Sequence, residues 1–503
     1  MVSSSSMSAP LMVTVSGVRG IANVSLTPEL VKVFVASFIK YLESKHPTAD
    51  KLIVLGRDSR ISGLDFEKLT IATITSLGWD VQVLGICPTP TVQFMVPKLN
   101  ATGGLVITSS HNPAEWNGLK FVDMDGLFVT AENCETIFSI YRSQTAESSF
   151  PILIKDPEKH GTASNYDQAM QEHIDAVTSL EYVHVDQIKA AHFKVAIDTI
   201  NGAGSLYIPA LLEALGVEVV GELNTDPTGM FSHIPEPVPQ NLTDLCQLVK
   251  SIESDFGIAV DPDADRLVII NEKGEPIGEE YTLALCVDFF LSEKTRRGPV
   301  VKNLSTSRVI DDICRKYHCA CYSSAVGEAN VAAMMERVNA VIGGEGNGGI
   351  MLPDVHVGRD SLVGLALILE HFSRFRQSRS TDPAPPALSD LVGSLPHYDI
   401  IKDKISLSEQ TTPEQIKIVL QRVEEEWKKK IEEERAKADN EELKALWNVN
   451  DVDGIRIDTP DWWVHLRMSN TEPIVRIIAE APTRVKAREQ CTFFARYFSI
   501  PSD

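Results

Sequence analysis

The feature that most constrains the fold is a repeated alternation of two kinds of segment. Short β-branched runs that stop at Gly, Asp, Ser or Pro are typical of strands, and segments with helical period lie between them. The strand-like runs include "KLIVLGRD", "DVQVLGI", "GGLVITSS", "FKVAIDT", "VEVVGEL", "FGIAVDPDADR" and "GPVVKNLSTS". Such alternation indicates an α/β fold, in which ligands bind at the carboxyl ends of the strands. We therefore look for the functional site at polar strand tips.

The chain is long enough for several domains. Its 503 residues correspond to three or four domains at roughly 100–200 residues each. Composition shifts near 143–165 and 271–281, and a Pro- and Ser-rich stretch at 377–390, suggest three boundaries. Opposite charges four residues apart in 424–447 predict an exposed helix. We predict three α/β domains over 1–155, 156–275 and 276–385 and a C-terminal domain over 390–503.

Charge and composition exclude several function classes. Lys+Arg is 47 and Asp+Glu is 69, so the formal net charge is 47 − 69 = −22, which argues against nucleic-acid binding. No apolar run approaches the roughly 20 residues of a membrane span, and the N-terminus lacks the charged-then-apolar pattern of a secretory signal. Cys314, His318, Cys319 and Cys321 are close in sequence, but no second cluster completes a zinc spacing. We expect a cytoplasmic protein with free thiols that binds neither nucleic acid nor membrane.

The apolar run 103–107 is followed by the unusually polar stretch "TSSHNP". Its Ser110 can act as a nucleophile or phosphoryl acceptor if a nearby group accepts and returns the hydroxyl proton. His111 and Lys120 are the candidates for that task. Taken alone, the stretch could equally be a structural turn, because Asn112-Pro113 favours one.

The stretch "VDPDADR" carries three carboxylates, Asp261, Asp263 and Asp265, at every second residue. Carboxylates this close repel one another unless a cation lies among them, and hard oxygen ligands at a strand tip favour Mg²⁺. A calcium EF-hand is one alternative, since Glu272 falls at the twelfth position, but the sixth is Arg266 rather than the required glycine. An aspartyl phosphatase and a solvated acidic turn are the others.

The glycine-rich stretch "GGEGNGG", 343–349, would let the backbone approach a ligand closely. Glu345 and Asn347 within it suit the hydroxyls of a sugar. Many glycine-rich loops are only turns, so this stretch is weak evidence on its own.

The stretch "RMSNTEPIVR" offers hydroxyl and amide donors from Ser469, Asn470 and Thr471 between Arg467 and Arg476. Arginine forks match phosphate oxygens. The stretch therefore predicts a phosphate-binding loop, with a capping turn flanked by surface arginines as the alternative.

Together, these four stretches resemble the motifs of the α-D-phosphohexomutase superfamily, which includes phosphoglucomutases, phosphomannomutases and phosphoglucosamine mutases. The motifs occur in the family's order, and the resemblance covers nearly the whole chain. It implies three related α/β domains with mixed sheets and a smaller α+β C-terminal domain around a central cleft. It also implies interconversion of hexose 6-phosphate and hexose 1-phosphate through a phosphoserine enzyme and a 1,6-bisphosphate intermediate.

The resemblance also assigns roles to residues. Ser110 would carry the phosphoryl group and, with Asp261, Asp263 and Asp265, hold Mg²⁺. Lys120 would be the general acid/base, with a pKa lowered by nearby cations, and Arg19 and His111 would assist at the phosphoserine. The implied substrate-binding residues are Arg266, Glu345, Asn347, Arg359, Arg467, Ser469, Asn470, Thr471 and Arg476. "GRDSR" with Arg57, "VGEAN" at 326–330, and "HVGRDSL" with His356 and Asp360 resemble further family loops.

The sequence constrains the preferred sugar less than it constrains the type of reaction. The form "GEGNGG" resembles a subgroup named mostly phosphoglucosamine mutase, so we expect conversion of glucosamine 6-phosphate to glucosamine 1-phosphate. Phosphomannomutase or phosphoglucomutase activity is the alternative, and a non-catalytic sugar-phosphate sensor is an alternative of another class. The resemblance further implies a hexose 1,6-bisphosphate activator, and we expect a monomer or homodimer.

Overall fold

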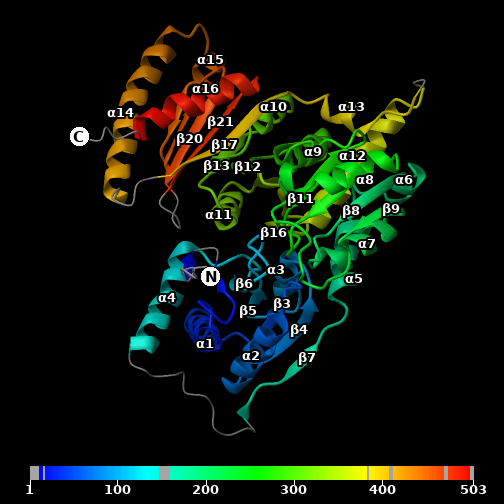
Figure 1. Cartoon of the computed structure of the whole chain (residues 1–503), viewed down its shortest axis with the longest axis vertical. Helices are drawn as coiled ribbons and strands as arrows, with labels where there is room; N and C mark the ends of the chain where they lie inside the picture. The colour runs from blue at the N-terminus through cyan, green and yellow to red at the C-terminus, as the bar shows by residue number, and fades with distance from the viewer. Residues whose placement is uncertain are drawn as a thin grey trace, which may run out of the picture.

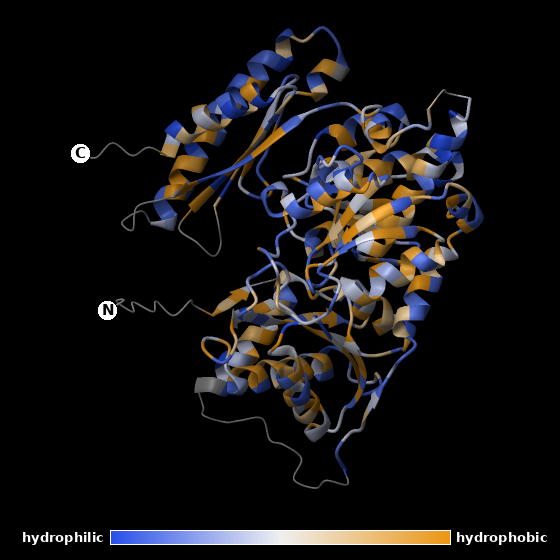
Figure 2. Cartoon of the chain, turned by 45° about the vertical axis from the view of Figure 1, so that its right-hand side comes forward, coloured by the Kyte–Doolittle hydropathy of each residue, from blue (hydrophilic) through white to orange (hydrophobic). Residues whose placement is uncertain are grey.

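The computed structural model describes residues 11–14, 17–146, 159–381, 384–406, 412–468 and 474–498. Four sheets follow one another along the chain, each accompanied by its own helices (Figure 1). Apolar residues concentrate in the strands, and the helices carry their polar residues on their outer sides (Figure 2). Within the described residues, no helix combines the length and apolarity needed to cross a membrane.

The first sheet has seven strands in the order β1-β2-β6-β5-β3-β4-β7. Its strands are β1 (Met12–Thr14), β2 (Gly17–Ile21), β3 (Leu52–Arg57), β4 (Asp80–Ile86), β5 (Gly103–Ile107), β6 (Trp116–Asp123) and β7 (Ala163–Asn165). Its helices are α1 (Pro28–Lys45), α2 (Gly63–Ser76), α3 (Thr89–Lys98) and α4 (Ala131–Ala146). Strands β3, β4, β5 and β7 are parallel, whereas β6 runs antiparallel to β5. The sheet is therefore mixed.

The second sheet has four strands in the order β11-β10-β8-β9. The strands are β8 (Lys194–Asp198), β9 (Glu218–Leu223), β10 (Phe256–Val260) and β11 (Leu267–Asn271). The helices are α5 (Ala169–Thr178), α6 (Val185–Ala190), α7 (Gly204–Ala214) and α8 (Thr243–Ser251). Strands β8, β9 and β10 are parallel, and β11 returns antiparallel to β10.

The third sheet has five strands in the order β13-β12-β14-β15-β16. The strands are β12 (Val300–Asn303), β13 (Cys321–Ser324), β14 (Ile342–Glu345), β15 (Gly349–Leu352) and β16 (His356–Arg359). The helices are α9 (Glu279–Ser292), α10 (Val309–Lys316), α11 (Glu328–Val338) and α12 (Ser361–Ser378). Strands β12, β13 and β14 are parallel, and β15 again returns antiparallel to β14.

The fourth sheet is antiparallel throughout, in the order β17-β21-β20-β19-β18. Its strands are β17 (Asp399–Ser406), β18 (Asn448–Asn450), β19 (Ile455–Asp458), β20 (Trp463–Met468) and β21 (Ile474–Ala481). The short α13 (Leu388–Val392) precedes it, and α14 (Pro413–Lys437), α15 (Glu441–Ala445) and α16 (Arg484–Ala495) accompany it. The fold is thus three α/β domains with mixed sheets and a smaller α+β C-terminal domain, as predicted.

Separate apolar clusters hold these parts together. One apolar cluster joins the first three domains and includes Val92 of α3, Ile208 of α7 and Leu365 of α12. The C-terminal core is a different cluster, whose buried members lie between Ile401 and Phe498. Since apolar burial is the main stabilising term in folding, the first three domains form one packed unit, whereas the C-terminal domain has a core of its own.

Polar contacts attach the C-terminal domain to the third. Arg456 Nη1 donates to the carbonyl oxygens of Leu304 at 2.7 Å and Thr306 at 3.2 Å. In return, the backbone N–H of Arg308 donates to Glu480 Oε1 at 3.0 Å. These contacts orient the last domain without merging the two cores.

The seven strand-like runs of the sequence are all strands, but two details differ from expectation. Strand β7 lies beyond residue 155 and still pairs with β4, so the first sheet extends past the predicted limit of the first domain. The charged region 424–447 contains the C-terminal part of α14, which ends at Lys437, and the whole of α15, which begins at Glu441. In addition, α14 buries Val423, Trp427 and Ile431 against the sheet.

Candidate active site

Three of the predicted motifs occupy equivalent places in three sheets. In each sheet, a strand of the parallel set is followed by an antiparallel neighbour, and the motif lies at that turn. Ser110 lies between β5 and β6, the three aspartates between β10 and β11, and Asn347 between β14 and β15. The related architecture of the three domains thus supplies three loops of the same kind.

These loops meet in one cleft of about 610 Å³. Ten predicted site residues line it: Arg19, Ser110, His111, Lys120, Arg266, Glu345, Asn347, Arg359, Arg467 and Arg476. The three aspartates are fully buried beneath its surface. Ser469, Asn470 and Thr471 lie outside the described residues.

The loop of Ser110 has a conformation fixed by its neighbours. Ser110 has φ +48°, in the left-handed region that non-glycine residues rarely adopt. Its N–H donates to Thr108 Oγ1 at 2.9 Å, and Arg60 Nη2 donates to its carbonyl oxygen at 2.6 Å. Arg60 is 1 % exposed and paired with Asp58. Strained backbone is held in this way where the surroundings over-determine it, so the loop presents the serine hydroxyl in one direction.

That hydroxyl points at the acidic loop. Ser110 Oγ donates to Asp261 Oδ2 at 3.1 Å and lies 3.2 Å from His111 Nδ1. The positive charge of Arg266, burial, and the charge of Arg19 hold the pKa of His111 well below its usual value. His111 is therefore a neutral imidazole next to the serine.

The acidic loop has the chemistry of a divalent-cation site. Oxygens of Asp261, Asp263 and Asp265 lie within 4.8 Å of one another. Asp263 Oδ1 and Asp265 Oδ1 are buried without a hydrogen-bond partner among the described residues, and burial together with the two neighbouring carboxylates raises the pKa of Asp261 well above its usual value. Buried carboxylate oxygens that lack a donor are costly, so these residues fit a metal ion.

The EF-hand alternative fails on the position of Glu272. This residue accepts hydrogen bonds from Ser389 N at 3.1 Å and Ser389 Oγ at 2.5 Å. The acidic loop is moreover flanked by strands β10 and β11 rather than by the two helices of an EF-hand.

Lys120 connects the serine loop's domain to the acidic loop. Its Nζ lies 2.6 Å from Asp263 Oδ2 and 3.4 Å from Asp265 Oδ2, and Thr89 Oγ1 also donates to Asp263 Oδ2 at 2.6 Å. Burial alone would lower the pKa of Lys120, but the two carboxylates outweigh it and raise the pKa above its ordinary value. The lowered pKa that we expected is therefore wrong for this arrangement, in which Lys120 is an ammonium.

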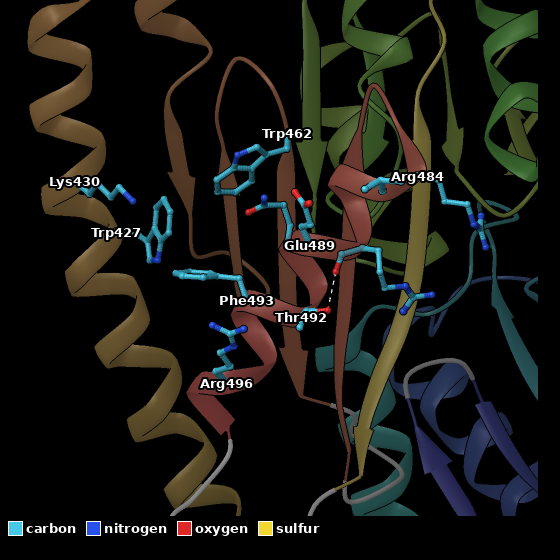
Figure 3. Close-up of a pocket in the computed structure, with 11 residues that line it drawn as sticks. Trp427, Lys430, Trp462, Arg484, Glu489, Thr492, Phe493 and Arg496 are labelled. Carbon is cyan, nitrogen blue, oxygen red and sulfur yellow. Dashed lines mark hydrogen bonds between the residues drawn. The ribbon is translucent and has the colours of Figure 1, made fainter.

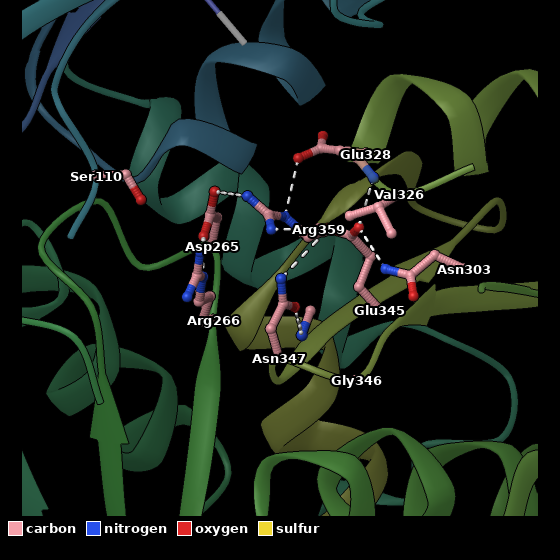
Figure 4. A network of polar contacts seen from close by, with 12 residues as sticks. Ser110, Asp265, Arg266, Asn303, Val326, Glu328, Glu345, Gly346, Asn347 and Arg359 are labelled. Carbon is pink, nitrogen blue, oxygen red and sulfur yellow. Dashed lines mark hydrogen bonds and ion pairs between the residues drawn. The ribbon is translucent and has the colours of Figure 1, made fainter. Parts of the chain in front are cut away.

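Arg359 joins the acidic loop to the glycine-rich loop (Figure 4). Its three nitrogens contact Asp265 at 2.5 Å, Glu345 at 2.9 Å and Glu328 at 3.0 Å. Glu345 Oε1 additionally accepts from Asn303 Nδ2 at 2.7 Å. A buried cation with three carboxylates fixes the two loops relative to each other.

The C-terminal side of the cleft is more open. Arg467 Nη1 lies 3.5 Å from Asp453 Oδ2, and Arg476 on β21 is exposed. Both line the cleft opposite the serine loop's domain. Two guanidinium groups, one of them with no ion pair among the described residues, suit an anionic ligand.

Sequence reasoning missed several residues that shape the cleft. In "GRDSR" it selected Arg57, which pairs with Glu67, whereas Asp58 and Arg60 of the same motif hold the serine loop. Sequence proximity alone does not distinguish the contacts of Asp58 and Arg60 from those of Arg57. Lys402 also lines the cleft, and no motif marks it in the sequence.

Two other features of the described residues were considered as sites. His173, His356 and Asp360 form a buried hydrogen-bonded cluster that joins α5 to the start of α12, with both imidazoles on Asp360 Oδ2 at 2.8 and 3.1 Å.

A hollow of about 800 Å³ lies between α14 and α16, lined by Trp427, Trp462 and Phe493 among others (Figure 3). The hollow contains none of the predicted site residues, whereas ten of them line the cleft.

Comparison with known proteins agrees with this architecture. Models of the phosphoglucomutase/phosphomannomutase family match the chain as alpha/beta/alpha domain I over 11–148, domain II over 171–274, domain III over 278–384 and the C-terminal domain over 419–496. A phosphoglucomutase/phosphomannomutase of Thermococcus kodakarensis is 35% identical, covering 94% of this chain and 95% of its own. A probable phosphoglucosamine mutase of Methanopyrus kandleri is 31% identical, covering 94% of each.

A crystal structure of a phosphoglucomutase/phosphomannomutase family protein from Burkholderia thailandensis shares the fold, with a TM-score of 0.76, 23% identity and 97% of each chain covered. The matches define the class of protein as a hexose-phosphate mutase, which is an intramolecular phosphotransferase. This chain belongs to the phosphoglucomutase/phosphomannomutase family.

Proposed function

We propose that this protein interconverts glucosamine 6-phosphate and glucosamine 1-phosphate through a phosphorylated Ser110 and a 1,6-bisphosphate intermediate. The observation that carries the proposal is the contact of Ser110 Oγ with the buried carboxylate triad at 3.1 Å. A phosphoryl acceptor next to a site for a divalent cation is the arrangement that phosphoryl transfer requires.

The acidic loop would hold Mg²⁺ through Asp261, Asp263 and Asp265, together with an oxygen at Ser110. The ion would neutralise charge that develops on the transferring phosphoryl group. Arg266, whose N–H donates to Asp261 Oδ1 at 3.2 Å, supports the shape of this loop. Its guanidinium also lines the cleft.

Lys120 is our candidate for proton transfer. Because it is held as an ammonium, it would donate a proton to Ser110 Oγ as the serine–phosphorus bond breaks. It would then take the proton of the sugar hydroxyl that attacks the phosphorus, so that the hydroxyl oxygen forms the new phosphorus–oxygen bond. Neutral His111 lies next to the serine, and the cation Arg19 contacts the same loop, where its Nη1 donates to Asn112 Oδ1 at 3.2 Å.

The remaining predicted residues would bind substrate. Glu345 and Asn347 face the cleft and offer a carboxylate and an amide to sugar hydroxyls or to an amino group. Arg467 and Arg476, with Ser469, Asn470 and Thr471, would hold the non-reacting phosphate, and hexose 1,6-bisphosphate would serve as the activator. Arg359 would set the position of Glu345 through their 2.9 Å contact.

A second candidate is phosphomannomutase or phosphoglucomutase activity. It is favoured by the Thermococcus kodakarensis relative at 35% identity, which is a phosphoglucomutase/phosphomannomutase. The glycine-rich loop favours the amino sugar, because the carboxylate of Glu345 can pair with a charged 2-amino group.

The test is mutase turnover on glucosamine 6-phosphate, mannose 6-phosphate and glucose 6-phosphate, side by side, with Mg²⁺ and a trace of the matching bisphosphate. Preference for glucosamine 6-phosphate, lost in Ser110→Ala, supports the proposal. Preference for mannose or glucose phosphate would move the assignment to the second candidate. Sugar-phosphate binding without turnover would support the sensor alternative.

A further inference from the structure

Lys402 lies where the C-terminal domain meets the glycine-rich loop. It is on β17, the first strand of the C-terminal sheet, and its side chain lines the cleft. Its Nζ donates to the carbonyl oxygen of Gly346 at 3.1 Å and to Glu279 Oε2 at 2.8 Å, and lies 3.2 Å from Glu280 Oε1. One ammonium therefore contacts the loop backbone and the first turn of α9.

Glu280 supports the loop from beneath. It is 4 % exposed, and its Oε2 accepts from the N–H of Ser307 at 2.9 Å. Burial raises its pKa to about 7 against the opposing charge of Lys402. A Cβ at Gly346 would lie 1.8 Å from Glu280 Oε2, so the loop backbone rests directly on this carboxylate.

The contact between Lys402 and Gly346 bears on the two side chains that face the sugar. Glu345 precedes Gly346 and Asn347 follows it, so the position of the Gly346 peptide determines where both begin. Misplacing substrate-orienting groups by about 1 Å can cost about 100-fold in rate. A cation that ties this peptide to two carboxylates is therefore placed to hold both side chains in position.

The strand that carries Lys402 is itself anchored to the third domain. The hydroxyl of Tyr281, one residue after Glu280, donates to the carbonyl oxygen of Pro396 at 2.9 Å and accepts from the N–H of Tyr398 at 3.0 Å. The start of β17 and the first turn of α9 therefore hold a fixed separation, which keeps Lys402 within reach of Gly346.

We propose that Lys402 is a positioning residue for sugar recognition, which acts through Gly346 and links the C-terminal domain to the glycine-rich loop. The proposal rests on the proposed function only in taking that loop as the sugar-binding element. It predicts that loss of Lys402 weakens binding of the hexose part of the substrate and leaves binding of phosphate intact.

The test is equilibrium binding by calorimetry of glucosamine 6-phosphate, glucose 6-phosphate and inorganic phosphate to the full chain with Mg²⁺. Lys402→Met removes the charge and keeps an unbranched apolar side chain. The matched control is Lys404→Met, because Lys404 is on the same strand and its side chain forms no ion pair with a carboxylate among the described residues. Lys402→Arg should largely restore binding, since it keeps the cation.

We expect Lys402→Met to bind both hexose phosphates about tenfold more weakly, with a smaller ratio between the two sugars, and to bind inorganic phosphate like the wild type. Gly346→Ala disturbs the same contact from the glycine-rich loop. It should likewise weaken binding of both hexose phosphates and leave binding of inorganic phosphate unchanged. Unchanged hexose-phosphate affinity in Lys402→Met would overturn the proposal, whatever the result for Gly346→Ala. An equal loss for hexose phosphates and inorganic phosphate would also overturn it, because Lys402 would then be a phosphate ligand. Absence of wild-type turnover would count against the proposed function, while the binding comparison would still decide the role of Lys402.

Discussion

The three α/β domains and the C-terminal domain contribute to one cleft in different ways. The first three share an apolar core and contribute the serine, the lysine and the three aspartates, all of them buried. The C-terminal domain has its own core and meets the third domain through polar contacts. Packed apolar cores deform little, whereas polar contacts that involve titratable groups depend on charge and pH. Changes in the first region should therefore act on the rate of chemistry, and changes in the second on binding and on pH dependence.

The largest effect is expected at Ser110. Ser110→Ala removes the hydroxyl that donates to Asp261, and should lower turnover by at least roughly 1,000-fold. The thermal midpoint should change little, because Ser110 Oγ makes few contacts. Intact-mass measurement after incubation with a hexose 1,6-bisphosphate should show a phosphorylated wild type and an unmodified variant.

The matched control is Ser109→Ala, whose hydroxyl donates to Asn112 Oδ1 at 3.1 Å within the same loop. It should keep phosphorylation and most of the turnover. A Ser110→Ala protein that still turns over at the wild-type rate would show that the first region does not hold the phosphoryl acceptor at this serine.

The next effect concerns the acidic loop. Asp263→Asn removes a charge from the triad and from the 2.6 Å pair with Lys120, so Mg²⁺ should bind at least roughly 10- to 100-fold more weakly. Calorimetric Mg²⁺ titration measures this directly. In parallel, chelation with EDTA should abolish wild-type turnover, and added Mg²⁺ should restore it.

Asp65→Asn is the control, because Asp65 is an exposed carboxylate on α2 in the same packed unit. It should leave Mg²⁺ affinity unchanged. Equal Mg²⁺ affinity in Asp263→Asn and the wild type would place the metal outside this triad.

The sequence predicted the two regions unequally, for physical reasons. Strand runs and motif loops are local patterns, so the α/β fold and the loops of Ser110, Asp263 and Asn347 could be identified from neighbouring residues. Arg60 and Lys402 act on loops that lie 50 and 56 residues away in sequence, and such partners leave no local pattern. The roles of the site residues, the domain limits and the oligomeric state stay predictions.

A smaller effect is expected where the C-terminal domain meets the third. His465 on β20 is 1 % exposed. Its Nδ1 shares a hydrogen bond of 2.9 Å with Ser305 Oγ, and its Nε2 contacts the carbonyl oxygen of Asp453 at 2.6 Å. Burial lowers its pKa to about 4, against about 6.5 in an unfolded chain. Between these two pKa values His465 is protonated in the unfolded chain and neutral in the folded one. The stability that the neutral imidazole contributes is therefore complete above about pH 6.5 and is lost as pH falls towards about 4.

From about pH 7 to pH 5, the wild type should therefore lose about 2 kcal/mol more of its free energy of unfolding than His465→Gln does. Urea unfolding followed by tryptophan fluorescence measures this, since Trp463 lies in the same sheet. Parallel pH profiles for the two proteins would show that the neutral imidazole does not stabilise the domain contact.

The smallest effect separates binding from chemistry on the C-terminal side. Arg467→Met removes a cleft-lining cation whose nearest carboxylate is 3.5 Å away, so KM for the hexose phosphate should rise about tenfold with kcat largely retained. Arg484→Met is the matched control, because Arg484 lines the outer hollow of the same domain and not the cleft (Figure 3); its kinetics should match those of the wild type. A fall in kcat at constant KM for Arg467→Met would mean that the C-terminal domain takes part in the chemical step, and the division between the two regions would then fail.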